Sequence, residues 1–257
     1  MGKKRIGLNV RNTAVLLDHL PHYYEDSVTV LQEFGGPSVH FHLRALEELA
    51  KQNGFLSDSH LEMIYATLAS WGMHRMGDPE DTKAKMVEFE AFRSSLLQCR
   101  DRLSDLRQYR IEIPAGQYAE LLSGLAPIYS GLVVSIADST LVAHAKTLAH
   151  ILPDLLPPID RQYTVRFFEH DASEFFVQNK RTGKWNYRGL QLSEAAEHFE
   201  QYVSLCCKIK ALFDQAQDRY PDLMQVTGQG FNTSYPKIID NLIMAFVKTV
   251  KPPQNTP

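Results

Sequence analysis

The chain has 257 residues, a formal net charge of −3 and a hydrophobic fraction of 44%. These values are typical of a globular protein with a substantial core, and no apolar run reaches the roughly 18 residues of a membrane-spanning helix. The slight negative charge excludes an overall positive coat for non-specific nucleic-acid binding, whereas a local basic face can still contact DNA.

The cysteine content favours reduced thiols. Cys99, Cys206 and Cys207 provide neither a disulfide framework nor the CxxC spacing of metal and redox sites. The N-terminal MGKKRIGLNV is charged and lacks the apolar core of a secretion signal. We therefore expect a cytoplasmic protein with no membrane segment.

The start of the chain is expected to be irregular as far as Gly36, apart from one short helix. That helix covers 12–19, with Asn12 as its cap and Pro21 close to its end. Clear helices then follow over 38–54 and 58–71, because apolar residues recur there at three-and-four spacing.

The segment GMHRMGDP, 72–79, is expected to be a loop, and a long amphipathic helix to run from 79 to 108. RIEIPAG, 110–116, reads as a connector, and NKRTGKWNYRGL, 179–190, as a loop or at most a hairpin. Further helices are predicted over 117–125, 127–136, 193–217 and 235–250. The fold class is therefore mainly α, as one helical domain over 1–257 or as two lobes, 1–115 and 116–257, around a central cleft.

The stretch LVAHAKTLAHILPDLLPPIDRQYTVRFF, 141–168, contains the most informative residues. Its first half is an apolar helix with a single lysine, Lys146, and Asp160 follows three prolines at the start of another helix. Burial of a lysine favours its neutral, nucleophilic amine, whereas backbone N–H groups at a helix start keep a carboxylate ionised. The ordinary alternatives are a surface lysine and a plain helix cap.

This order of Lys146-Thr147, an apolar run, a proline-led turn and Ile159-Asp160 resembles the helix-hairpin-helix DNA glycosylases over residues 138–168. The Gly-x-Gly that usually precedes the lysine in that family is absent here, since the preceding residues are Leu141-Val142-Ala143-His144-Ala145. The resemblance implies that a target nucleotide is flipped out of the duplex, that Lys146 attacks its sugar and that Asp160 stabilises the positive charge. The resulting Schiff base would permit strand cleavage, and neither metal nor cofactor is implied.

Binding of DNA requires basic side chains, and a base pocket requires aromatic and polar walls. Candidates for the DNA contact are Arg161, Arg166, Lys180, Arg181, Lys184 and Arg188. Candidates for the base pocket are Trp71, His74, Arg75, His42, Phe231 and Asn232. Solvated loops and ordinary packing are the alternatives for both sets. The ten histidines show no HExxH pattern, so we expect no metal site.

The sequence therefore predicts a DNA glycosylase, with or without abasic-site lyase activity, that excises an unusual or modified base. Such an enzyme would act in repair or in defence against phage with modified DNA. One alternative is a non-enzymatic helical DNA-binding protein that uses Lys146 for phosphate contact. Another is a helical protein-interaction module in which Lys146 and Asp160 form a structural ion pair.

Overall fold

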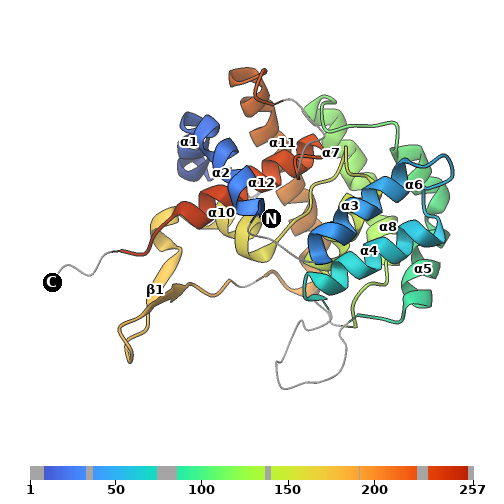
Figure 1. Cartoon of the computed structure of the whole chain (residues 1–257), viewed down its shortest axis with the longest axis horizontal. Coiled ribbons are helices and arrows are strands. Elements are labelled where there is room, and N and C mark those ends of the chain that lie inside the picture. Colours follow the sequence, from blue (N-terminus) through green and yellow to red (C-terminus); the bar gives the residue numbers. More distant parts are fainter. Residues whose placement is uncertain are drawn as a thin grey trace, which may run out of the picture.

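The computed structural model describes residues 9–32, 37–73, 86–136, 140–190, 192–224 and 231–253. Within these ranges the protein is mainly helical, as predicted, with one two-stranded antiparallel sheet (Figure 1). None of the helices in these ranges has the length and apolar character of a membrane span.

The N-terminal region contains two helices, α1 (Val10–Asp18) and α2 (Leu20–Gln32). The expectation of irregular chain after the first short helix was therefore wrong over 20–32; residues 33–36 lie outside the described ranges. Pro21 is the second residue of α2, where the missing N–H would have no helical partner, so it begins a helix rather than ending one. The cap of α1 is also one turn earlier than expected, because Asn9 Oδ1 accepts the N–H of Asn12 at 3.2 Å.

Helices α3 (Pro37–Ala50) and α4 (Asp58–Ser70) pack against each other (Figure 1). Helix α4 matches the predicted 58–71 to within one residue, whereas α3 ends four residues before the predicted 54. The turn between them requires Gly54, since an added Cβ there would lie only 1.7 Å from the carbonyl oxygen of Glu48. Ser57 caps α4 by accepting the N–H of His60. This helix pair brings His42 and Trp71 toward the same side of the molecule.

The long helix expected over 79–108 was wrong in the described part of that range. It consists of α5 (Phe89–Gln98) and α6 (Arg100–Leu106), which meet at Cys99; residues 79–85 lie outside the described ranges. Before α5 the backbone is extended, because the N–H of Val87 donates to the carbonyl of Val134 at 3.2 Å. The same pairing ends α8 (Ala126–Gly131) earlier than the predicted 127–136.

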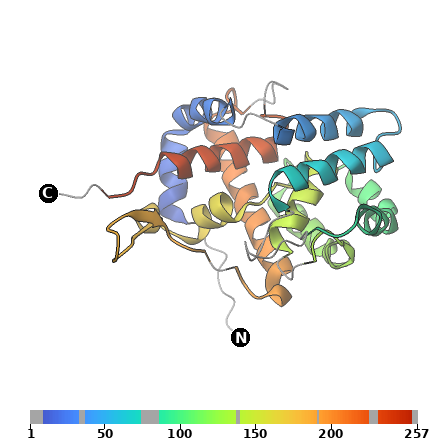
Figure 2. The ribbon, with the colours of Figure 1, turned by 60° about the horizontal axis from the view of Figure 1, so that its bottom comes forward.

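The C-terminal part of the chain supplies the centre of the molecule. After the hairpin of β1 (Phe176–Gln178) and β2 (Trp185–Tyr187), the long α11 (His198–Arg219) crosses α12 (Tyr235–Thr249), which packs on α2 as well (Figure 2). Every residue of α12 from 236 to 247 is buried, as expected of a helix that neighbours surround. The remaining elements are α7 (Ala115–Gly124), α9 (Leu141–Ile151), a π-helical turn (Arg161–Val165), α10 (Arg166–Glu169) and short 3-10 turns (Ala172–Glu174 and Ala195–Glu197).

Helix α1 contacts α11 and α12, and α2 contacts α12, so the beginning of the chain packs with its end. The side chain of Asn12 ties α1 to α10 and to the turn that follows α10. Its amide donates to the carbonyls of Phe167 and His170, each at 2.8 Å, and its oxygen accepts the N–H of Ala172 at 3.1 Å. Asn12 is 1% exposed, so no water replaces these bonds if they are lost.

We predict that Asn12→Ala lowers the free energy of unfolding by about 2 kcal/mol or more, because it leaves buried backbone groups unpaired. Urea unfolding followed by circular dichroism measures this change. The exposed neighbour Arg11 is the matched control, and Arg11→Ala should change stability by less than about 0.5 kcal/mol. Equal effects of the two substitutions would contradict the role assigned to Asn12.

Candidate functional site

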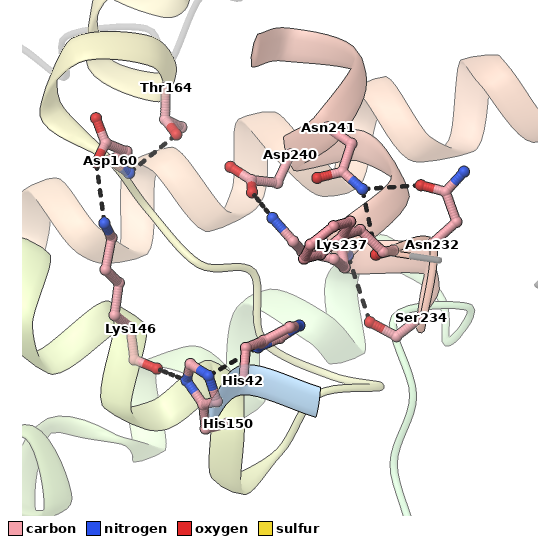
Figure 3. Close-up of polar contacts among 11 residues, drawn as sticks. His42, Lys146, His150, Asp160, Thr164, Asn232, Ser234, Lys237, Asp240 and Asn241 are labelled. Atoms are coloured by element: carbon pink, nitrogen blue, oxygen red, sulfur yellow. Dashed lines mark hydrogen bonds and ion pairs between the residues drawn. The ribbon is translucent and has the colours of Figure 1, made fainter. Parts of the chain in front are cut away.

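Lys146 and Asp160 meet as an ion pair although 14 positions separate them in the chain. Lys146 Nζ lies 3.0 Å from Asp160 Oδ2, and the two side chains are 13% and 27% exposed (Figure 3). Lys146 projects from α9, and the extended, proline-containing segment after that helix returns the chain to face it. The proline-led turn therefore determines where the carboxylate lies.

Asp160 is held by the π-helical turn that begins directly after it. Its Oδ1 accepts the N–H of Gln162 at 2.7 Å, and its own N–H donates to Thr164 Oγ1 at 3.1 Å. The N–H groups of Thr164 and Val165 both donate to the Asp160 carbonyl, at 3.0 and 3.1 Å. One carboxylate oxygen thus caps the turn while the other faces Lys146. Turns of this wide type are rare and occur frequently at functional sites.

These contacts keep Asp160 ionised. Burial by itself would raise the pKa of the carboxyl group. The charge of Lys146, its hydrogen bond and the N–H groups of Gln162 and Tyr163 outweigh burial, so the pKa of Asp160 lies below its usual value. The group is therefore an anion at neutral pH.

The pair opens into a cavity of about 450 Å³. Above Lys146 lies the ring of Trp71, whose centroid is 4.8 Å from Nζ, a cation–π contact. The lining residues are Ser38, Val39, His42, Ser70, Trp71, Gly72, Lys146, Pro158, Asp160, Tyr163, Phe231, Lys237, Asp240 and Met244. The cavity therefore combines aromatic and apolar walls with four charged side chains.

A second lysine–aspartate pair, absent from the sequence prediction, lines the same cavity. Lys237 Nζ lies 2.6 Å from Asp240 Oδ2, one turn along α12, with side-chain exposures of 11% and 9%. Burial raises the pKa of Asp240 above its usual value; Lys237 acts against this, and the charge of Asp160 adds to it. The sequence feature that could have indicated this pair is a lysine and an aspartate three positions apart among the apolar residues of α12.

Two buried histidines connect Lys146 to the wall of the cavity. His150 Nδ1 lies 2.7 Å from the Lys146 carbonyl, and His150 Nε2 lies 2.9 Å from His42 Nδ1 (Figure 3). Because a carbonyl only accepts, His150 donates from Nδ1 and accepts at Nε2, and His42 donates from Nδ1. Burial lowers the pKa of His150 to about 4 and that of His42 well below its usual value, so both rings are neutral at pH 7.

Three of the residues predicted for the base pocket lie together. The His42 ring lies 5.8 Å from the ring of Trp71 and 6.2 Å from that of Phe231, with which it is nearly parallel. Asn232, in contrast, does not line the cavity. It is 4% exposed and accepts from Asn241 at 2.8 Å, so it anchors the segment before α12. The predicted His74 and Arg75 lie outside the described residues.

The residues predicted to contact DNA divide into two groups. Arg166 is 3% exposed, and it donates to the carbonyls of Phe175 and Arg188 at 3.1 Å each, so it holds the hairpin and offers no surface to a phosphate. The others are exposed: Arg161, Lys180, Arg181, Lys184 and Arg188. Residues 175–190 contain four basic and no acidic side chains, and the hairpin projects from the helices (Figures 1 and 2).

Comparison with protein-family models, curated proteins and solved structures gave no match. Among the residues that the structure describes, no group of three or more His, Cys, Asp or Glu side chains is arranged to hold a metal ion. The side chains that line the cavity are therefore the basis for inferring its chemistry.

The buried histidines predict a loss of stability in mild acid. A histidine whose pKa is lower in the folded than in the unfolded chain takes up a proton when the chain unfolds at a pH between those two values. Its contribution is complete above the unfolded pKa of 6.5 and is lost as the pH falls toward the folded value, about 4 for His150. We expect His150 to account for roughly 2 kcal/mol of the loss in unfolding free energy between pH 7 and pH 5.

Urea unfolding of wild type and His150→Asn at both pH values measures this contribution. The difference between them isolates the histidine from Asp240, whose raised pKa acts in the opposite direction. His22, whose side chain is 65% exposed, provides the control substitution His22→Asn. If wild type and His150→Asn lose equal stability, His150 is not buried as a neutral ring.

Proposed function

We propose that the protein is a DNA glycosylase that accepts a flipped nucleotide in the cavity between α9, α12 and the turn after Pro158. The observation that carries the proposal is the Lys146–Asp160 pair, at 3.0 Å, on the wall of a cavity of about 450 Å³. That volume falls within the range of about 300–1,000 Å³ that is usual for small-molecule sites. The substrate is an unusual or modified base, since unpairing costs least where a base is altered.

Asp160 acts on the sugar as the glycosidic bond breaks. The bonding electron pair leaves with the base, and positive charge develops on C1′ and the ring oxygen. An anion that is already fixed by the Gln162 N–H stabilises this charge without reorganisation. The N–H groups of Gln162 and Tyr163 also lower the pKa of Asp160, so they favour the anion when Lys146 has become neutral.

Lys146 gives up one proton to water and, as a neutral amine, bonds to C1′ through Nζ. A second proton passes from the nitrogen to the departing base. The nitrogen lone pair then forms the C1′=N bond while the C1′–O4′ electron pair goes to O4′, which takes a proton from water. The resulting Schiff base permits elimination of the 3′ phosphate, which is the lyase activity.

The basic hairpin supplies the contact with the DNA backbone. Lys180, Arg181, Lys184 and Arg188 are exposed there beside the aromatic rings of Trp185 and Tyr187, and Arg161 is exposed next to Asp160. Cationic and aromatic side chains on one projecting element suit phosphate contact and stacking on an unpaired base.

We predict that Lys146→Ala and Asp160→Asn each reduce base release by roughly 100-fold or more, because each removes a group that acts on the transition state. Release is measured as alkali-sensitive sites in duplexes that each contain one modified base. Lys210 and Asp214 form a matched ion pair on α11, away from the cavity lining. Lys210→Ala and Asp214→Asn should leave release by the folded protein unchanged; equal losses at the two pairs would contradict the catalytic roles.

We also predict that Arg181→Gln/Arg188→Gln weakens DNA binding and lowers the slope of log affinity against log salt by about 0.9 for each phosphate contact removed. Titration of labelled duplex at several salt concentrations measures the slope. Arg110→Gln/Arg219→Gln removes two exposed arginines from other surfaces and should leave the slope unchanged. A hairpin variant with the wild-type slope would place the DNA contact elsewhere.

A further inference from the structure

The proposed sugar chemistry involves Lys146 and Asp160 at one end of the cavity, and it gives no role to the Lys237–Asp240 pair. Figure 3 shows the polar ends of Lys237 and Asp240 pointing toward those of Lys146 and Asp160. All four side chains line the cavity. If the sugar lies at Lys146 and Asp160, the base extends toward the pair on α12.

The pair has unused hydrogen-bonding capacity although it is buried. An ammonium has three donors and a carboxylate has about four acceptor positions, and buried groups of this kind normally have partners. Among the described residues, the Lys237 ammonium has one hydrogen bond, to Asp240 Oδ2, at 2.6 Å. A ligand in the cavity can therefore receive from Lys237 and donate to Asp240 side by side.

The positions of these two side chains are fixed in advance. They lie three residues apart on α12, whose residues from 236 to 247 are all buried. Ser234 caps the helix, and Asn241 ties the preceding segment to it through Asn232. Phe231, in that segment, lines the same cavity and offers a face on which a base can stack. Groups on such a rigid element can discriminate between ligands.

We propose that Lys237 and Asp240 read the flipped base, and that they accept a base whose edge presents a carbonyl oxygen next to a ring N–H. This inference rests on the proposed glycosylase function. The carbonyl receives from Lys237, and the N–H donates to Asp240. As the base departs with the electron pair, negative charge spreads onto the carbonyl oxygen, where the Lys237 ammonium stabilises it.

A base edge with an amino group next to an unprotonated ring nitrogen fits less well. Its ring nitrogen is a weaker site for the departing negative charge than a carbonyl oxygen. Its amino group is also a less acidic donor to Asp240 than a ring N–H. The pair therefore distinguishes two base edges that have otherwise similar shapes.

Matched duplexes test this assignment. One pair of DNAs contains a single 5-hydroxymethyluracil or 5-hydroxymethylcytosine. The other contains a single hypoxanthine or unsubstituted purine, whose edge has an unprotonated ring nitrogen and no N–H donor for Asp240. We expect release of the first base of each pair to be about 100-fold faster. Faster release of 5-hydroxymethylcytosine or purine overturns the base-reading assignment and leaves the glycosylase proposal intact.

The variant Lys237→Met/Asp240→Leu separates base reading from sugar chemistry. It replaces both charges, because a single replacement would leave one buried charge unpaired. We expect base release to fall about 100-fold, whereas borohydride trapping on DNA with a preformed abasic site stays at the wild-type level, since no base has to be read there.

The other outcomes distinguish failure of the base-reading role from failure of the glycosylase proposal. Unchanged base release by the double variant overturns the assignment, and so does a joint loss of release and trapping, which a purely structural pair would produce. If the wild type is trapped on abasic DNA but releases neither carbonyl-bearing base, the base-reading role fails. If the wild type shows neither trapping nor release of any base, the glycosylase proposal fails and this inference with it.

Discussion

The contact between Lys146 and Asp160 is the constraint on which the arrangement of the cavity depends. An ammonium and a carboxylate that are largely removed from water stabilise each other only if both are held in place. Asp160 is held by the turn that it caps, and Lys146 by the apolar helix α9. The proline-led segment between them brings the two ends together, so the ion pair is set by the backbone.

The same helix also orders the wall of the cavity. The Lys146 carbonyl accepts from His150, which in turn accepts from His42. A change in the position of α9 would therefore shift the charged amine and the aromatic wall together. Coupling of this kind keeps a nucleophile aligned with the pocket that holds its substrate.

The two carboxylates of the cavity differ in their surroundings, and their pKa values are shifted in opposite directions. Asp160 accepts backbone N–H groups as well as Lys146, and its pKa is lowered. Asp240 lies on the side of a buried helix, near the charge of Asp160, and its pKa is raised. Two acids whose environments separate their pKa values typically have different roles in a reaction. Under the proposed function, one end of the cavity would take a cationic sugar and the other the edge of a base.

Sequence patterns predicted the helical class, α3, α4 and α12, because amphipathic spacing and caps are local signals. They also singled out Lys146 and Asp160, since a lysine in an apolar helix is locally unusual. Local signals failed where distant segments decide the structure. The pairing of Val87 with Val134 delays the start of a helix that was predicted from 79, and the carbonyls around Arg166 come together only once the hairpin has folded.

The Lys237–Asp240 pair was missed for a related reason. An i, i+3 pair of opposite charges usually marks the solvated face of a helix. Only the packing of α2 and α11 around α12 shows that this face is buried and borders a cavity.

Mass-spectrometric mapping of the lysine that becomes attached to DNA shows whether Lys146 is the nucleophile. The protein is incubated with duplex containing an abasic site, reduced with borohydride and digested. We predict a deoxyribose remnant on Lys146. A remnant on Lys237 or on another lysine, or no adduct at all, would contradict it.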